Sequence, residues 1–341
     1  MKEKVLSKKK FPKFVEELLK ISKVIAPIKK NGFYVFQEVK AADEISLNFL
    51  NTKIPPKEIF YPRTETLFTY TKKNDGIEIV ENENSVENQI ILGIRSCDAK
   101  SFILLDKFFA FGKFQDPYYK KRRKKTIIIG LACIEPSNTC FCTSLGGSPF
   151  GEEGIDIILT DLGENYLVKS LNNKGDQLLE KISVLESASD TDISIAEELK
   201  KKAIASIRTK FPLEKMNTKL DQLFDEEAFW EQFSNKCIGC ASCTFLCPTC
   251  SCFDVTDEET ANSGKRVRLW DTCQFPLFTK HGSGHNPRPN RRQRLRQRVM
   301  HKFSYYPKVL NEIGCVGCGR CIIVCPVNQD IRVVFKTLQE A

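Results

Sequence analysis

The chain has 341 residues, 28% of them charged and 41% hydrophobic, which is typical of a globular protein with room for two or three domains. Its net charge of +9 gathers in two basic runs, residues 120–125 and 288–298, but neither run alternates with aromatic side chains, so we expect no nucleic-acid partner. No apolar run approaches the ~18 residues that a membrane span needs, and residues 1–14 lack the apolar core of a secretory signal. We therefore expect a cytoplasmic protein whose fifteen cysteines stay reduced.

The first half of the sequence indicates an α/β domain over residues 1–165. Apolar residues at helical spacing predict a helix over 11–24, and Lys29-Lys-Asn-Gly32 is typical of a hairpin turn between two apolar stretches. Further strands are expected at residues 77–80, 90–94, 126–131 and 155–159, and a helix at 99–109. The segment between the strand at 90–94 and this helix places Cys97 in a loop where the helix begins.

The second half of the sequence predicts mostly helices. Residues 166–225 are dominated by Glu, Lys and Leu and predict a helical connector. Residues 226–341 hold two copies of a cysteine motif, and residues 254–313 between the copies form an insertion that a compact two-cluster ferredoxin does not need. We expect the α+β class, with an N-terminal α/β domain, a helical connector and a mostly helical, ferredoxin-like C-terminal domain that carries this insertion.

The cysteine motif is C-x₂-C-x₂-C-x₃-C-P, at residues 237–248 and again at 315–326. This spacing is typical of bacterial proteins with two iron–sulfur clusters, in which three thiolates of a run bind one 4Fe–4S cluster and the fourth reaches the other cluster. The crossed pattern assigns Cys237, Cys240, Cys243 and Cys325 to one cluster, and Cys315, Cys318, Cys321 and Cys247 to the other. An uncrossed arrangement is one alternative. A zinc site is another, although zinc rarely uses two identical four-cysteine runs.

Four more cysteines fall in the N-terminal half, at Cys97, Cys133, Cys140 and Cys142. Cys97 and Cys133 each follow an expected strand, which brings them toward one edge of a sheet, and the other two lie on a loop that ends in glycines. Four thiolates from three loops would hold a third 4Fe–4S cluster. The alternative is ordinary packing, because free cysteine is among the most buried residue types.

Three cysteines remain, at Cys250, Cys252 and Cys273. Their pattern leaves three roles open: packing, redox-active thiols, or ligands to a further group. We favour packing or local polarity around a cluster.

Five strings in the chain resemble a known family. They are Arg95-Ser-Cys-Asp-Ala-Lys, Cys140-Phe-Cys-Thr-Ser, Cys247-Pro-Thr-Cys-Ser-Cys-Phe-Asp-Val, Arg268-Leu-Trp-Asp-Thr-Cys and Gly284-His-Asn-Pro-Arg-Pro. Together they resemble the family that contains the iron–sulfur β subunit of sulfhydrogenase and its counterpart in anaerobic sulfite reductase, over about residues 90–330. The resemblance implies an anaerobic iron–sulfur protein with a third cluster on the four N-terminal cysteines, three of which (Cys97, Cys140 and Cys142) lie in the quoted strings. Cys250, Cys252 and Cys273 recur in the family too, so the resemblance implies that their presence matters without implying their chemistry.

The function that these motifs predict is electron transfer within a hetero-oligomer. The resemblance implies a flavin-containing, NAD(P)H-linked partner on one side and a terminal oxidoreductase of the hydrogenase, sulfite reductase or heterodisulfide reductase type on the other. We expect no catalysis by the chain alone, since no G-x-G-x-x-G fingerprint follows a strand. The alternative is a self-contained iron–sulfur oxidoreductase with an unrecognised active site.

The second basic run supplies a candidate docking surface. Four of its arginines are the candidates: Arg291, Arg292, Arg294 and Arg296. The guanidinium group stays charged and grips carboxylates, so these residues would dock an acidic partner or tune the potential of a cluster.

Overall fold

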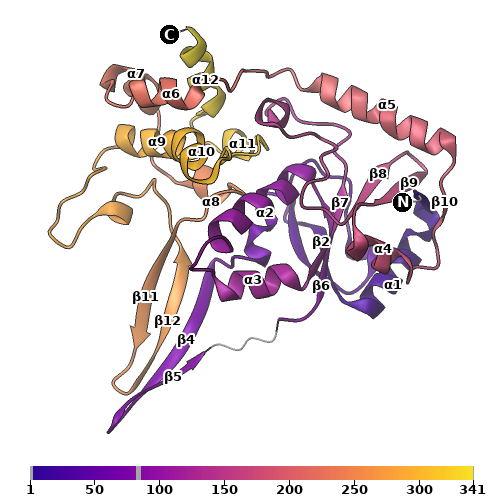
Figure 1. Cartoon of the computed structure of the whole chain (residues 1–341), viewed down its shortest axis with the longest axis horizontal. Helices are drawn as coiled ribbons and strands as arrows, with labels where there is room; N and C mark the ends of the chain where they lie inside the picture. The colour runs from indigo at the N-terminus through magenta and orange to yellow at the C-terminus, as the bar shows by residue number, and fades with distance from the viewer. Residues whose placement is uncertain (1–2, 82–85, 341) are drawn as a thin grey trace.

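The computed structural model describes residues 3–81 and 86–340, which contain two β-sheets (Figure 1). The larger sheet has eight strands in the order β10-β1-β9-β8-β7-β6-β2-β3. Its strands are β1 (Lys4–Ser7), β2 (Lys23–Lys30), β3 (Phe33–Val39), β6 (Gln89–Ile94), β7 (Thr126–Leu131), β8 (Ile157–Asp161), β9 (Asn165–Ser170) and β10 (Glu186–Ser187). The four central strands, β2, β6, β7 and β8, are parallel, and the outer strands pair antiparallel.

Helices cover both faces of this sheet. Strands β6 and β7 are runs of Ile and Leu, as expected for central strands that are buried on both faces. Ile90 packs in one core with α1 (Phe11–Ile21) and α4 (Asn173–Leu179), whereas its neighbour Ile91 packs in a second core with α2 (Ser96–Phe109) and α3 (Pro117–Lys124). Successive strand residues point to opposite faces, so one strand serves two cores.

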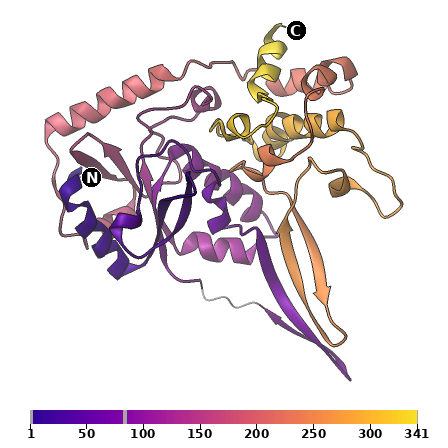
Figure 2. The ribbon, with the colours of Figure 1, turned by 180° about the vertical axis from the view of Figure 1, so that it is seen from behind.

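The smaller sheet joins two distant parts of the sequence. Its order is β11-β12-β4-β5, with β4 (Thr64–Lys73), β5 (Gly76–Glu81), β11 (Phe253–Glu259) and β12 (Ser263–Trp270), all antiparallel. The two hairpins lie side by side and extend away from the rest of the protein (Figures 1 and 2). At the base of the sheet, the buried Arg268 forms ion pairs with Glu65 and Asp116. The expected insertion therefore completes a sheet that the N-terminal half begins.

Helices form the C-terminal part of the chain. They are α5 (Asp190–Ser206), α6 (Met216–Gln222), α7 (Glu227–Ser234), α8 (Ser242–Phe245), α9 (Arg291–Met300), a π-helical turn η6 (His301–Tyr305), α10 (Tyr306–Leu310), α11 (Arg320–Ile323) and α12 (Ile331–Glu340). Short 3₁₀ turns are η1 (Lys8–Lys10), η2 (Ala42–Glu44), η3 (Pro56–Ile59), η4 (Cys142–Leu145) and η5 (Pro276–Thr279). A third core around Trp230, Phe303 and Phe335 packs α6, α7, α9, η6 and α12 together. In the described part of the chain, no helix has the length and apolar character to cross a lipid bilayer.

The α+β class expected from the sequence is confirmed, with local corrections. The helix expected over 11–24 ends at Ile21, because Lys23 already begins β2, and residues 166–225, expected to be helical, also contain β10 and most of β9. The expected hairpin is β2–β3, and the expected strands appear as β5 to β8. The helix expected at 99–109 begins earlier, at Ser96, because the Asp98 and Ala99 N–H groups already donate to the Arg95 carbonyl oxygen. Cys97 therefore lies in the first turn of α2 and not in a loop. The expected boundary at residue 165 falls at the first residue of β9, and the division into three domains stays a prediction.

A buried ion pair joins α2 to the second cysteine motif. Arg320 donates to both carboxylate oxygens of Asp98, at 2.5 and 2.6 Å, and its Nε donates to the Thr52 carbonyl oxygen at 2.8 Å. Next to it the Phe141 N–H donates to the Gly317 carbonyl oxygen at 2.9 Å. Gly317 has a φ of 65°, and a Cβ there would lie 2.5 Å from the backbone nitrogen of Cys142. We call this contact of residues 317–320 with residues 52, 98 and 139–142 the seam.

The seam generates a stability prediction. Asp98→Asn leaves the Arg320 charge buried without its counter-ion, which should lower the free energy of unfolding by about 3–5 kcal/mol. The measurement is denaturant unfolding followed by circular dichroism, with iron content determined on the same samples. Glu258→Gln is the control, because its ion pair with Lys265 is half exposed and should contribute under about 1 kcal/mol. Equal unfolding midpoints for the two variants would contradict a structural role for the seam.

Candidate iron–sulfur centres

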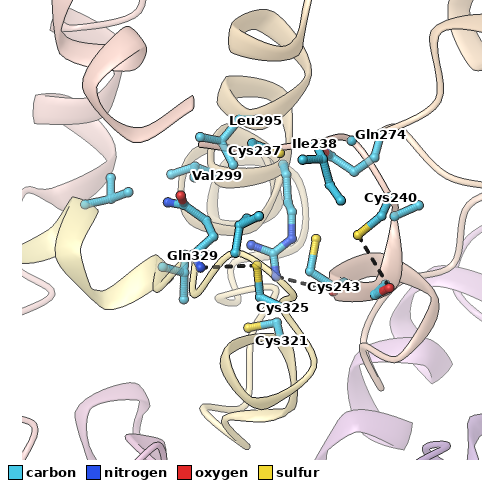
Figure 3. Close-up of a pocket in the computed structure, with 17 residues that line it drawn as sticks. Cys237, Ile238, Cys240, Cys243, Gln274, Leu295, Val299, Cys321, Cys325 and Gln329 are labelled. Carbon is cyan, nitrogen blue, oxygen red and sulfur yellow. Dashed lines mark hydrogen bonds between the residues drawn. The ribbon is translucent and has the colours of Figure 1, made fainter. Parts of the chain in front are cut away.

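The first sulfur set lies around a cavity between α9, α8 and the C-terminal segment (Figure 3). It is lined by Cys237, Cys240, Cys243 and Cys325, with Cys321 at its border. The backbone reaches the cavity as well, since the Gln329 N–H donates to Cys325 Sγ at 3.1 Å. Burial raises the pKa of Cys243 to about 11, against the opposing charge of Arg298. All four cysteines that the crossed pattern assigns to one cluster therefore line one cavity.

The second sulfur set consists of Cys247, Cys315, Cys318 and Cys321. Cys247 lies close enough to Cys315 and Cys318 for its charge to raise the pKa of both thiols. The charge of Cys321 acts on Cys315 in the same way. Burial raises the pKa of Cys315 to about 11. Cys247 thus lies with the second motif and Cys325 with the first, which is the grouping of the crossed pattern. The ligation of clusters by these sets stays a prediction.

A buried lysine contacts the second set. Lys302, in η6, donates to Cys247 Sγ at 3.4 Å, to Thr249 Oγ1 at 2.8 Å and to the Gly314 carbonyl oxygen at 2.8 Å. The pKa of Cys247 is held well below its ordinary value, first by a hydrogen bond with Cys250 and then by the charge of Lys302. Cys247 is therefore favoured as a thiolate, the form that binds metal.

The third sulfur set is formed by the four N-terminal cysteines. Cys97, Cys133, Cys140 and Cys142 line one cavity, and Cys318 of the second set borders it too. Cys97 comes from α2, Cys133 follows β7, and the other two precede or begin η4. Burial raises the pKa of all four thiols, to about 11 for Cys140 and about 12 for Cys142. The sheet edge and the seam therefore bring these sulfurs together.

The donor chemistry fits iron–sulfur clusters. Each set offers four sulfurs, the ligands of a 4Fe–4S cluster. Among the buried donor atoms of the described residues that lack a hydrogen-bond partner, two lie at the sulfur sets: Arg298 Nε, at the first set, and Arg95 Nε, at the third. Unpaired buried donors are costly unless a negatively charged group lies beside them. Within residues 3–81 and 86–340, no three His, Cys, Asp or Glu side chains are arranged to hold a single metal ion.

The structure corrects the picture of one exposed basic run on α9. Arg294 is buried and donates to the Pro289 carbonyl oxygen at 2.7 Å, so it is withdrawn from the docking hypothesis. Arg298 is also buried, between the sulfur sets. A helix presents every third or fourth residue to its core, so a continuous run of charges cannot all face water.

The remaining arginines of the docking hypothesis have partners within the chain. Arg291 is exposed and donates to the Cys237 carbonyl oxygen at 2.8 Å. Arg292 forms an ion pair with Glu227, and Arg296 lies 3.8 Å from the ring centroid of Phe224. These three side chains retain surface exposure, so their docking role stays a prediction.

Several charged residues at the sulfur sets were missed by the sequence pattern. Lys57, in η3, is fully buried and donates to the Cys250 carbonyl oxygen at 2.7 Å. Arg320 and Lys302 are likewise buried. No local signal marks Lys57, because it reaches the sulfurs only through the tertiary fold. Arg320 follows Cys318 by two residues inside the motif, and this position was the one available signal.

Comparison with known proteins agrees with the motif. The family described as 4Fe-4S dicluster domain matches residues 236–329. Sulfhydrogenase 2 subunit beta of Pyrococcus furiosus is 33% identical over 332 residues, which covers 97% of this chain and 96% of the relative. No solved structure gives a significant match. The 4Fe–4S clusters expected from the repeated motif are thereby confirmed as cofactors.

The three sulfur sets predict the amount of iron. Three 4Fe–4S clusters correspond to about twelve irons and about twelve inorganic sulfides per chain. Anaerobic iron and sulfide analysis tests this number, and Cys133→Ala should remove about four of each because its set loses one of four ligands. Values near eight in the unmodified protein would leave the third set to packing.

The crossed grouping predicts which cluster a substitution damages. Cys325→Ala should impair the cluster at Cys237, Cys240 and Cys243 and leave the one at Cys315 and Cys318, because Cys325 lines the first cavity. Cys247→Ala is the matched variant and should have the reverse effect. Electron paramagnetic resonance of the reduced proteins distinguishes the clusters, and loss of the opposite signal in each variant would establish the uncrossed arrangement.

Proposed function

This chain belongs to the sulfhydrogenase β-subunit family, and from this we propose that it relays electrons between a terminal oxidoreductase and a flavin-containing, NAD(P)H-linked subunit. The terminal partner would be of the hydrogenase, sulfite reductase or heterodisulfide reductase type. The proposal includes a hetero-oligomer in the cytoplasm of an anaerobic cell, without a nucleic-acid partner. The fifteen cysteines, all free among the described residues, favour a reducing compartment.

The observation that carries this proposal is the continuity of the sulfur sets. Cys318 belongs to the second set and borders the cavity of the third. Cys321 belongs to the second set and borders the cavity of the first. A bound 4Fe–4S cluster supplies one-electron transfer. The chain would thus hold a row of carriers in the order third, second and first set.

The chain's own contribution would be to position these carriers and to tune them. Lys302 and Arg298 place two buried positive charges beside the sulfurs of the first and second sets. Arg320, paired with Asp98, lies between the second and third sets. Positive charge favours the more reduced, more negative form of a carrier, and burial strengthens the effect. The three cations would therefore keep the row reducible.

The alternative, a self-contained oxidoreductase, requires a substrate site in addition to the sulfur sets. The proposal differs from it in one measurable respect. A relay accepts and donates electrons but turns over no substrate alone.

The first functional prediction concerns the purified chain. It should bleach with dithionite and reoxidise with a dye, yet show no NAD(P)H oxidation, hydrogen uptake or sulfite reduction. Addition of a terminal oxidoreductase and a flavin subunit from the same source should restore turnover, because the relay then has both its partners. Steady NAD(P)H oxidation by the isolated, flavin-free chain would favour the self-contained enzyme instead.

The second functional prediction concerns docking at α9. Replacing Arg291, Arg292 and Arg296 together by Gln should lower the coupled rate by roughly tenfold at low salt and less at high salt, because salt screens charge-steered association. The control replaces the exposed Lys120, Lys121 and Lys124 of the other basic run by Gln and removes the same charge. Equal effects of the two triple variants would make the loss one of net charge and not of a docking site.

A further inference from the structure

Cys252 and Cys273 lie side by side at the open end of the β11–β12 hairpin. Cys252 directly precedes β11, and Cys273 follows β12 by three residues. The hairpin register pairs Phe253 with Trp270, and the Asp271 N–H donates to the Cys252 carbonyl oxygen at 3.0 Å. The two thiols are hydrogen-bonded to each other. Neither cysteine belongs to one of the three sulfur sets.

The surroundings of this pair are polar and positively charged. Cys273 is buried, and the side-chain amide of Gln274 donates to its Sγ at 3.6 Å. The hydrogen bond with Cys252, followed by Gln274 and the charges of Arg298 and Lys302, lowers the pKa of Cys273 to about 6 despite burial. The hydrogen bond with Cys273, together with burial, raises the pKa of Cys252 far above its ordinary value. The pair therefore holds one thiolate and one thiol.

The other roles left open by the sequence fit this geometry less well. A metal site would need a third sulfur, but the nearby Cys250 is hydrogen-bonded to Cys247. A packing thiol in an apolar core has a raised pKa, because burial disfavours the charged form. A thiol with a low pKa whose hydrogen-bonded partner is partly exposed to solvent, as Cys252 is, is typical of a reactive cysteine.

We propose that Cys252 and Cys273 are a redox-active dithiol that closes reversibly to a disulfide at the base of the β11–β12 hairpin. To close it, the Cys273 thiolate attacks one sulfur of a small-molecule disulfide and expels one thiolate. The Cys252 thiol then passes its proton to that thiolate and attacks the Cys273 sulfur, which releases the second thiolate. The S–S bond of the small molecule breaks, the bond between the cysteines forms, and two electrons pass to the small molecule.

The position of the pair connects it with the relay. Cys273 lies close enough to Cys243 of the first set for its charge to raise the pKa of that thiol. Cys252 acts in the same way on Cys250, which lies beside the second set. Two one-electron equivalents and one proton reopen the disulfide. Their supply from the first and second sets rests on the proposed relay function, whereas formation of the disulfide does not.

The test is a redox titration read by mass spectrometry. Anaerobically purified holoprotein is equilibrated with mixtures of oxidised and reduced dithiothreitol, quenched in acid, alkylated with N-ethylmaleimide and digested with trypsin. The tryptic peptide of residues 269–280 contains Cys273 as its one cysteine, so its alkylation reports this residue directly. We expect it unmodified and linked to the peptide of residues 237–265 under oxidising mixtures. The ratio of linked to free peptide should change tenfold per about 30 mV, the two-electron slope.

Two serine variants identify the partner of Cys273. Cys252→Ser should abolish the linked peptide, whereas the matched Cys250→Ser, two residues away, should retain it. Iron content should stay near the unmodified value in both variants. The titration of the unmodified protein remains decisive if a variant does not fold.

Three results would overturn the proposal. Full alkylation of Cys273 at every mixture would leave the pair to packing. A drop of about four irons per chain in Cys252→Ser would make it a cluster ligand. A link that survives Cys252→Ser but not Cys250→Ser would assign the wrong pair. If the unmodified protein forms the linked peptide but supports no coupled turnover with its partners, the proposed relay function is contradicted and the dithiol proposal is not.

Discussion

The buried ion pair of Arg320 and Asp98 is the contact on which the proximity of the sulfur sets depends. Arg320 lies inside the second cysteine motif and Asp98 directly follows Cys97, so this pair joins a C-terminal motif to an N-terminal helix. Removing two charges from water is expensive, and only well-aligned hydrogen bonds offset the loss. Both carboxylate oxygens accept from the guanidinium, and Thr52 accepts from its Nε. The geometry is thus specific enough to set the spacing of two sites that are more than 200 residues apart in sequence.

Three buried positive charges of this protein lie beside cysteine sulfurs. Lys57, Arg298 and Lys302 are each buried, and each faces thiols of the cysteine-rich centre. Buried cations without a counter-charge are among the most destabilising groups that a protein can carry. In the proposed relay, deprotonated cysteines and the clusters that they would hold supply the opposite charge. Folding and cluster binding would then be linked, since iron requires thiolates and the buried lysines and arginine favour thiolates.

The sequence predicted what a repeated cysteine motif and an unbroken apolar run determine. The grouping of Cys325 with the first motif agrees with the crossed pattern, because three or four residues of chain permit few ways to surround a cubane. The unbroken apolar run at residues 90–94 likewise predicted the strand that the structure shows as β6. Pairing across the sheets was not predictable in this way: β4 and β12 are polar, exposed strands whose alternation is weak, and each is defined by the other. Lys57 and Asp98 were missed for the same reason, since their partners are distant in sequence.

The pairing of β4 with β12 also sets an order for biosynthesis. Thr69 of β4 pairs with Lys265 of β12, so one edge of β4 stays unpaired until the intervening chain has been synthesised. At roughly 5–20 residues per second, that interval is about 10–40 seconds. Throughout it the nascent chain presents a ten-residue strand with one edge unpaired, the kind of template on which neighbouring chains aggregate. The same last stretch of translation delivers both β12 and the second cysteine motif. Closure of the sheet and completion of the cysteine sets are therefore late events on the ribosome, and a chain that stops before Ser263 lacks both β12 and the second cysteine motif.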